Sequence, residues 1–381
     1  MTPDCHARLT ALRHELHRHP EISGQEQETA ARIVQRLQGY TPDQILTGLG
    51  GHGVAALFDS GNAGPTVAIR CELDALPIQE VSDAHPVSQV PGKGHLCGHD
   101  GHMVMVLGVG EALQEQPPQS GRVLLIFQPA EETGQGAAAL RADPRFETLS
   151  PDYVLSLHNL PGLELGSVEI CTESANCASR GMRIRLWGKT SHAAAPQDGL
   201  SPAAAMAELM PQLASLGQGG ALDETYALTT LTHANLGEAT FGVAPGYGEI
   251  WVTLRTVSDA RMTELMTAAE TLVQRIAVAQ GLRVEITYDD IFEACSNDPK
   301  MAELLQKACR TVGVPCEMTR QPQRFSEDFG QFSKSARTAM FWLGSGLDQP
   351  QLHNPDYNFP DALIPIGTGI FTAALRDLLE N

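Results

Sequence analysis

Three short apolar runs constrain the fold of this chain more than any other feature. The runs are TVAIR (66–70), RVLLIF (122–127) and YVLSL (153–157), and the segments near 101–115 and 131–141 favour helix. Strands that are apolar on both faces are typical of a parallel sheet covered by helices. Their alternation with helices therefore predicts an α/β sandwich with a mostly parallel sheet.

The same pattern continues at both ends of the chain. Helices are expected near 4–19, 25–38 and 299–312, and the apolar run TAMFWLG (338–344) adds a further strand. The sequence therefore predicts one discontinuous core domain that uses residues 1–177 and 291–381.

The segment between these two parts, 178–290, follows a different pattern. RGMRIRLWG (180–188) alternates between apolar and polar residues, which predicts a strand with one exposed face. The other expected elements are a helix at 201–216, strands at 226–233 and 248–256, a helix at 259–279 and a strand at 282–288. This βαββαβ order predicts an inserted ferredoxin-like domain.

The charge balance restricts the partners. The chain has 26 basic and 45 acidic residues, a formal net charge of −19. A field of this sign repels phosphate backbones and anionic membrane surfaces, so neither nucleic acid nor a membrane is expected as a partner. An anionic small molecule stays compatible, because a binding site can differ locally from the whole surface.

The start of the chain and its cysteines indicate a cytoplasmic protein. The first residues, MTPDCHARLT, lack the basic flank and apolar stretch of a secretory signal. No apolar run is expected to reach the roughly 18 residues of a membrane span. The eight cysteines form no CxxC pair and are expected to be reduced thiols.

One glycine motif has two interpretations. Gly48, Gly50 and Gly53 match the G-x-G-x-x-G pattern of dinucleotide-binding turns, which lie between a strand and a helix. Here VAALF follows and favours a strand, so we predict a glycine-rich hairpin turn.

Residues of the metal-ligating type follow several predicted strands. They are Glu72 and Asp74, Glu131 and Glu132, His158, and His353, and the segment HLCGHDGH adds His95, Cys97, His99, Asp100 and His102. Ligands of open α/β sheets gather at the carboxyl ends of the strands. Cysteine, histidine and carboxylate together suit Zn²⁺ and would also hold Mn²⁺, Co²⁺ or Ni²⁺. The number of candidates makes two ions plausible, with one glutamate of the adjacent pair binding metal and the other free as a general base.

A structural interpretation competes for each residue taken singly. Cys97 alone would be a buried thiol, and Glu131 and Glu132 alone would be a solvated helix start. Structural or surface roles are favoured for six other histidines, His14, His17, His19, His52, His85 and His233. The cluster as a whole favours a metal site.

Eight motifs occur in order from about residue 13 to residue 370. They are ELHRHPE (15–21), LDALPIQE (73–80), HLCGHDGH (95–102), FQPAEETGQGA (127–137), LHNLPG (157–162), SHAAAP (191–196), EDF (327–329) and LHNPDYNFPD (352–361). Together they resemble the metal-dependent aminoacylase–carboxypeptidase family, and most of all its hippurate-hydrolase and auxin-conjugate (indole-acetyl-amino acid) hydrolase branch. The resemblance implies a dinuclear catalytic α/β domain, an inserted ferredoxin-like lid that usually forms dimers, and amide hydrolysis.

The resemblance also implies roles for individual residues. The metal ligands would be Cys97, His99, Glu132, His158 and His353. Glu131 would be the general base that takes a proton from a water bridging the two ions. Asp74 would orient a ligand from outside the coordination shell. His192, on the inserted domain, would hydrogen-bond the scissile carbonyl or its oxyanion.

Two departures from the family pattern concern substrate recognition. The usual Arg-Ala-Asp is Arg70-Cys71-Glu72 here, which keeps the acid one methylene longer. The usual asparagine of an Asn-Val-Ile-Pro segment is Gly242, which has no side chain to hold a substrate carboxylate. Arg255 on the inserted domain is either a carboxylate partner or a structural arginine.

The expected function is therefore hydrolysis of an amide bond in a small N-acyl amino acid or related amide, by a dimer or larger homo-oligomer with two divalent ions per chain. Two alternatives stay open. One is a dipeptidase or carboxypeptidase on the same scaffold, and the other is a metal-stabilised binding protein without turnover.

Overall fold

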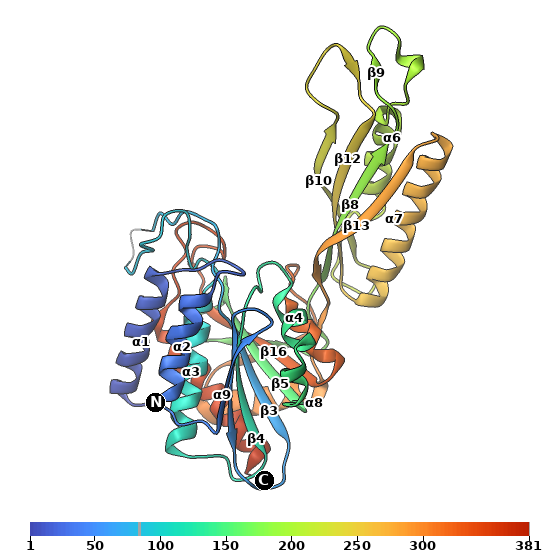
Figure 1. The fold of residues 1–381 in the computed structure, drawn as a ribbon. Helices are drawn as coiled ribbons and strands as arrows, with labels where there is room; N and C mark the ends of the chain where they lie inside the picture. Colours follow the sequence, from blue (N-terminus) through green and yellow to red (C-terminus); the bar gives the residue numbers. More distant parts are fainter. Residues whose placement is uncertain (83–84, 381) are drawn as a thin grey trace. The chain divides into compact units, whose positions relative to one another are not determined.

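The chain divides into two compact units in the computed structural model, which describes residues 1–82 and 85–380 (Figure 1). Unit 1 comprises Met1–Ala175, Cys295–Arg320 and Glu327–Asn381. Unit 2 comprises Asn176–Ala294 and Gln321–Ser326.

Unit 1 is built on an eight-stranded sheet with the order β1-β2-β4-β3-β5-β16-β6-β15. The strands are β1 (Gln44–Leu49), β2 (Gly53–Asp59), β3 (Thr66–Glu72), β4 (Arg122–Gln128), β5 (Tyr153–Pro161), β6 (Val168–Cys171), β15 (Cys316–Thr319) and β16 (Arg337–Gly346). The four central strands β4, β3, β5 and β16 are parallel. On one side β2 pairs antiparallel with both β4 and β1, and on the other β6 pairs antiparallel with β16 and parallel with the edge strand β15. The predicted α/β fold with a mostly parallel central sheet is confirmed.

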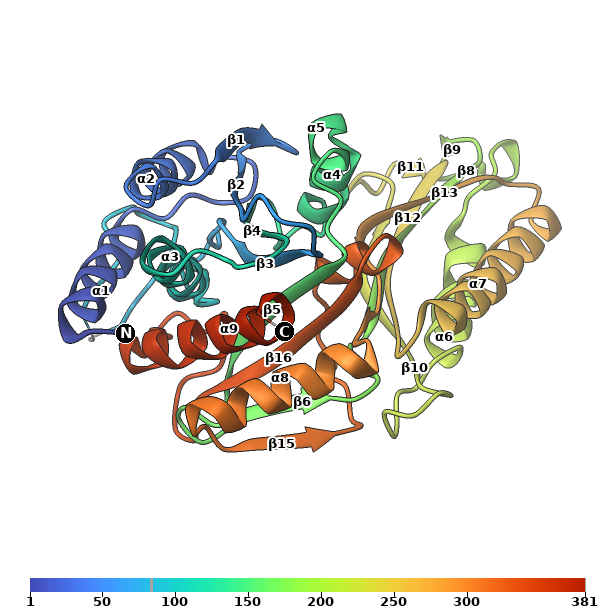
Figure 2. The same cartoon turned by 90° about the horizontal axis from the view of Figure 1, so that it is seen from below.

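Five helices cover one face of this sheet and share the main hydrophobic core with it (Figure 2). They are α1 (Pro3–Arg18), α2 (Gln27–Gln38), α3 (His99–Glu115), α8 (Pro299–Val312) and α9 (Ile364–Leu379). Val67 and Ile69 of β3 point into this core. Because side chains alternate along a strand, Arg70 and Glu72 share the opposite face.

Shorter elements cover that opposite face. They are α4 (Gly136–Ala142), α5 (Pro144–Glu147) and the 3₁₀ helix η2 (Asp328–Lys334). The helix α4 contacts β4 and η2, and η2 contacts β16. Polar side chains on this face, such as Gln128 and Ser156, are therefore fully buried.

Helix α8 illustrates how local sequence signals set an element. The Asp298 side chain accepts hydrogen bonds from the backbone N–H groups of Lys300 and Met301, and Pro299 occupies the first turn. Gly313 ends the helix with φ 76°, a left-handed conformation that costs glycine little.

The helix expected over 131–141 is shorter than predicted and begins only at Gly136. Residues 131–134 form a turn instead, in which the Gly134 N–H donates to the Glu131 carbonyl at 2.8 Å. Ala130 and Gly134 are both left-handed, with φ 51° and 68°, which interrupts helical geometry. Glu131 and Glu132 are thus held on a tight turn, and their interpretation as a solvated helix start is wrong.

The glycine motif near residue 50 lies in a hairpin turn. Strands β1 and β2 form an antiparallel pair around Gly50 and Gly51, which confirms the glycine-rich hairpin.

The segment Asp361–Leu379, with 19 residues, is long and apolar enough by length and composition to cross a membrane, so the expectation that no such segment exists is wrong. Half of its apolar window is buried inside the structure, as in a core helix of a globular domain.

Unit 2 contains a four-stranded antiparallel sheet with the order β10-β12-β8-β13. In chain order its main elements are β8 (Ala178–Trp187), α6 (Ala203–Ser215), β10 (Ala227–Leu236), β12 (Tyr247–Thr256), α7 (Asp259–Ala279) and β13 (Arg283–Phe292). Residues of both helices and of β8, β10 and β12 form a separate hydrophobic core. The predicted βαββαβ order is confirmed.

A short second ribbon completes unit 2. It pairs β9 (Ser191–His192) with β11 (Val243–Ala244), so that His192 faces Val243 across the ribbon.

Candidate metal centre

The candidate metal ligands of unit 1 lie at the carboxyl ends of the central parallel strands. Asp74 follows β3, the Glu131–Glu132 turn follows β4, and His158 lies near the end of β5. His353 comes from the loop after β16, and its N–H donates to the Leu96 carbonyl at 2.9 Å. The parallel order thus brings together side chains from four strand ends.

Five candidate ligands form two groups of three side chains, and Cys97 belongs to both groups. The donor atoms of Cys97, His99 and His158 lie within 4.8 Å of one another, and so do those of Cys97, Glu132 and His353. The two groups together contain all five residues that the resemblance implies as ligands. A shared thiolate between two groups of this size is suited to two neighbouring ions.

Gly98 lets the Cys97–His99 segment approach β5. Its φ is 91°, and a Cβ at this position would lie 2.3 Å from Oδ1 of Asn159. Any other residue here would displace either the loop or Asn159, so the close approach of Cys97 to His158 depends on a glycine.

Hydrogen bonds orient both histidines of the first group. Nδ1 of His99 donates to the Asp74 carbonyl at 2.9 Å, and Nδ1 of His158 donates to the Asn159 carbonyl at 2.8 Å. Each ring therefore keeps Nε2 for another partner, and Nε2 of His158 lies 3.4 Å from Sγ of Cys97. This is the arrangement in which a protein holds a metal-ligating imidazole.

Unpartnered buried atoms test whether a metal fits this cluster. Among the described residues, Nε2 of His99 and Oε1 of Glu132 are buried without a hydrogen-bond partner and lie 3.9 Å apart. Buried polar atoms rarely stay unpaired, because an unmet donor or acceptor costs about 1–3 kcal/mol. A cation between these groups would satisfy both.

The electrostatics of the cluster also favour a cation. Burial would lower the pKa of His99, yet the Asp74, Glu72 and Glu132 carboxylates raise that pKa to about 10. Burial, together with Glu132 and Glu131, raises the pKa of Cys97 well above its ordinary value. The field around these groups therefore stabilises positive charge, and a divalent ion would favour the thiolate that binds it.

His158 is suited to ligation in its neutral form. Burial, followed by the nearby His102, lowers the pKa of His158 well below its ordinary value. The ring therefore keeps a free lone pair for a metal at neutral pH.

The Glu131 carboxyl group lies beside the metal-binding cluster and next to a second carboxylate, Glu327. Its carboxyl is buried, and Oε2 lies 4.0 Å from Nε2 of His99. Burial, and then the Glu327 carboxylate next to it, raise the pKa of Glu131 well above its ordinary range. A carboxyl group in such surroundings can exchange a proton near neutral pH.

Asp74 contacts two of the candidate ligands, Glu132 and His99, without belonging to either metal-binding group. Its Oδ2 accepts hydrogen bonds from the Ser23 hydroxyl at 2.7 Å and from the Glu132 N–H at 3.0 Å. Its Oδ1 lies 3.6 Å from Nδ1 of His99. Asp74 thus connects one residue of each metal-binding group.

His192 belongs to unit 2 and not to this cluster. Its side chain is exposed, and Nδ1 accepts a hydrogen bond from the Ala194 N–H at 3.0 Å. In the neutral ring the proton must then be on Nε2, which is left as a hydrogen-bond donor.

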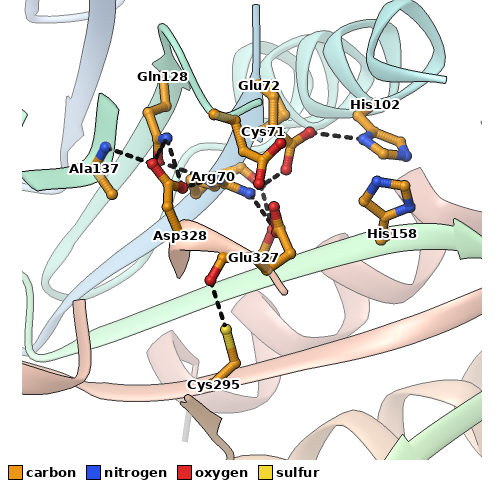
Figure 3. A network of polar contacts seen from close by, with 12 residues as sticks. Arg70, Cys71, Glu72, His102, Gln128, Ala137, His158, Cys295, Glu327 and Asp328 are labelled. Carbon is orange, nitrogen blue, oxygen red and sulfur yellow. Dashed lines mark hydrogen bonds and ion pairs between the residues drawn. The ribbon is translucent and has the colours of Figure 1, made fainter. Parts of the chain in front are cut away.

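The sequence reasoning missed a buried ionic network on the same face of the sheet (Figure 3). The Arg70 guanidinium contacts Glu72, Oε2 of Glu327 at 3.0 Å and Oδ1 of Asp328 at 2.7 Å. Glu72 in turn lies 2.7 Å from Nδ1 of His102. A signal was present, because Arg70 and Glu72 repeat with period two in a strand whose other residues from Val67 onward are apolar.

A second buried network involves His17, for which a structural role was expected. Its ring contacts Asp100 at 2.9 Å and Glu80 at 3.2 Å, and Arg13 contacts Asp100 at 3.2 Å. His17 is thus one member of a buried ionic network.

Comparisons with known proteins agree with this geometry. Residues 68–377 match peptidase family M20/M25/M40. The chain is 27% identical over 365 residues to a hippurate hydrolase of Campylobacter jejuni, covering 95% of this chain and 94% of that protein. It is 26% identical over 377 residues to an N-acetylcysteine deacetylase of Bacillus subtilis, covering 99% and 98% respectively.

A solved structure has the same fold. It is that of a Bacillus subtilis protein described as a dinuclear metal-binding peptidase of the M20 family, with a TM-score of 0.85, 24% identity and 100% of each chain covered. The family match spans both the strand ends and the residues of the metal-binding groups. The chain is a member of peptidase family M20/M25/M40.

Proposed function

We propose that the protein is a metal-dependent amidohydrolase that cleaves the amide bond of small N-acyl amino acids or related amides. The observation that carries the proposal is the pair of metal-binding groups sharing Cys97, with the buried Glu131 carboxyl beside them. A purely binding protein would need the ligands but not an additional proton-exchanging group. The names of the two relatives, a hippurate hydrolase and an N-acetylcysteine deacetylase, support this substrate class.

Two divalent ions held by Cys97, His99, Glu132, His158 and His353 would supply Lewis-acid activation of water and of the amide carbonyl. Zn²⁺, Mn²⁺, Co²⁺ and Ni²⁺ all suit this donor set. Each of the two groups offers three side chains with nitrogen, sulfur or oxygen donors, so each group could hold one ion.

The chain's own residues then carry the proton transfers. Glu131 accepts the proton of the attacking water and delivers it to the leaving amine after the tetrahedral intermediate forms. His192, through its Nε2–H, donates a hydrogen bond to the oxyanion of that intermediate. Asp74 holds His99 and the Glu132 backbone in place during these steps.

The inserted unit 2 is proposed as the lid and as the dimerisation surface of a homodimer. Its β10–β12 region exposes large apolar side chains, with Phe241 fully exposed and Val243 47% exposed. Exposed apolar surface of this kind is typical of interaction sites. Analytical ultracentrifugation of the wild type and of Phe241→Asp would test the oligomeric state.

Hydrolysis assays with purified, metal-reconstituted protein test the activity. N-acetyl, N-benzoyl and long-acyl amino acids are compared with their carboxamide counterparts, and Glu131→Gln serves as the blank. We expect cleavage by the wild type and a loss of roughly two to four orders of magnitude in Glu131→Gln, with bound metal unchanged.

The outcomes separate the competing functions. Full activity in Glu131→Gln would remove Glu131 from the general-base role. Cleavage of dipeptides in preference to acyl amino acids would indicate a dipeptidase or carboxypeptidase. Stoichiometric metal without turnover on any of these amides would favour the binding protein.

A further inference from the structure

Glu131 has a second carboxylate, Glu327, as its neighbour on the side facing Arg70. Oxygens of Glu131, Glu327 and Asp328 lie within 4.8 Å of one another in the buried interior. Each oxygen of Asp328 accepts two hydrogen bonds, Oδ1 from Arg70 and the Gln128 amide and Oδ2 from the Ala137 N–H and the same amide. Asp328 is therefore not available to Glu131.

Glu327 has one occupied and one unoccupied oxygen. Oε2 accepts from Nη1 of Arg70 at 3.0 Å, whereas Oε1 is buried without a hydrogen-bond partner among the described residues. Its side chain is only 2% exposed. An unpaired carboxylate oxygen in such surroundings calls for a donor from a neighbouring group.

The position of Glu327 is fixed from two sides (Figure 3). The Cys295 thiol donates to the Glu327 carbonyl at 3.3 Å. Arg70 is itself held by Asp328 and by Gln128, whose Oε1 accepts from Nε of Arg70 at 2.9 Å. The guanidinium thus serves as a rigid anchor, because each of its three nitrogens donates to a buried acceptor.

We propose that Glu327, anchored by Arg70, is a positioning residue that orients the Glu131 carboxyl for the reaction. When Glu131 carries the proton taken from water, Oε1 of Glu327 accepts a hydrogen bond from it and fixes its rotation. The inference rests on the proposed role of Glu131 as general base. Orientation matters because a misplacement of about 1 Å at a reacting group can cost a factor of about 100 in rate.

The first test is Glu327→Gln, which keeps the size of the side chain and an acceptor for Arg70. Its amide offers Glu131 a donor in place of an acceptor. We expect kcat to fall about 10- to 100-fold, with KM and the number of bound metals changed less than twofold. A kcat equal to that of the wild type would overturn the proposal.

A double-mutant cycle separates positioning from a general structural effect. If Glu327 acts through Glu131, then Glu131→Gln and the double variant Glu131→Gln/Glu327→Gln have the same residual activity within about twofold. An additive further loss would show that Glu327 acts independently of Glu131. If Glu131→Gln itself stays fully active, the proposed general base is wrong and not only its positioning.

Two further variants guard against misfolding and charge effects. Glu327→Asp keeps the negative charge beside Arg70, but its shorter side chain moves the acceptor oxygen away from Glu131. We therefore expect a reduced kcat. A kcat equal to that of the wild type would mean that Glu327 only balances the charge of Arg70. The matched control is Asn297→Ala, because buried Asn297 bonds the Cys171 and Met340 carbonyls at 2.8 and 2.9 Å without contacting Glu131. It should lower the melting temperature and leave kcat unchanged.

Discussion

Sγ of Cys97 lies 3.4 Å from Nε2 of His158, although the two residues are 61 positions apart in the chain. Cys97 precedes α3 and His158 lies in β5, so the contact depends on the parallel arrangement of the central strands. Cys97 is also the residue common to the two metal-binding groups. Its removal should therefore affect both groups, whereas loss of any other ligand affects one group first.

The first prediction concerns this shared cysteine. Cys97→Ala should lose most of both bound metals and with them the activity, measured by elemental analysis after dialysis. Cys71→Ala is the matched control, because Cys71 is also a buried thiol, donates through Sγ to the Ile126 carbonyl at 3.6 Å and belongs to neither metal-binding group. Full metal content in Cys97→Ala would mean that Cys97 is merely a buried thiol.

The second prediction concerns His192. His192→Ala should lower kcat by roughly 100- to 1,000-fold, the range for an oxyanion donor, with bound metal unchanged. His233→Ala is a suitable control, because His233 lies on β10 of the same unit and its ring packs against Trp251. An unchanged rate in His192→Ala would make His192 a surface residue.

The third prediction concerns Gly242. A Cβ at Gly242 would meet nothing within 4 Å, so Gly242→Asn should fold normally. If an asparagine here contacts a substrate carboxylate, the variant should raise kcat/KM for free acyl amino acids relative to their carboxamides by about 10-fold, as expected for one hydrogen bond to a charged group. Equal changes for both substrate types would exclude a carboxylate contact at this position.

The fourth prediction concerns the stability contributed by buried His17. Although burial would lower it, the Asp100 and Glu80 carboxylates raise the pKa of His17 to about 9. In the unfolded chain this pKa is about 6.5. Since the folded value is the higher one, the stabilisation is complete below pH ~6.5 and is lost as the pH rises through about 9.

Melting temperatures of the metal-free protein between pH 6 and pH 9.5 test this prediction. The difference between the wild type and His17→Gln should be largest at low pH, where it corresponds to a few kcal/mol, and should shrink towards high pH. His19→Gln is the control, because the His19 ring is only half-buried and donates through Nδ1 to a backbone carbonyl, that of Glu15, at 2.9 Å. A difference that does not vary with pH would contradict the role of the charged His17.

Much of the architecture could be predicted from local patterns. The runs at 66–70, 122–127 and 153–157 became the parallel strands β3, β4 and β5, because short and largely apolar runs are typical of strands covered on both faces. The alternating segment at 180–188 became β8 of the second sheet. The short strands β6 and β15, with four residues each, were missed, since so few residues carry little periodicity.

The Glu131–Glu132 turn could not be predicted in the same way. The segment 131–141 is rich in alanine, which favours helix. The helix nevertheless begins only at Gly136, because Ala130 and Gly134 adopt left-handed backbone conformations. Tertiary contacts decide this, because the Glu132 N–H donates to Asp74 and the Ala130 N–H donates to Glu26 at 2.8 Å.

The sequence by itself determined which side chains stand at the ends of the central strands, because strand and helix periods are local properties of the chain. It also contained all five residues of the two groups that share Cys97. Only the tertiary structure decided that Arg70 and Glu327, 257 positions apart, meet behind Glu131. Such contacts depend on strand order and on the packing of η2 over the sheet, which are non-local; the period-two repeat of Arg70 and Glu72 marks a buried polar face but does not identify its partner.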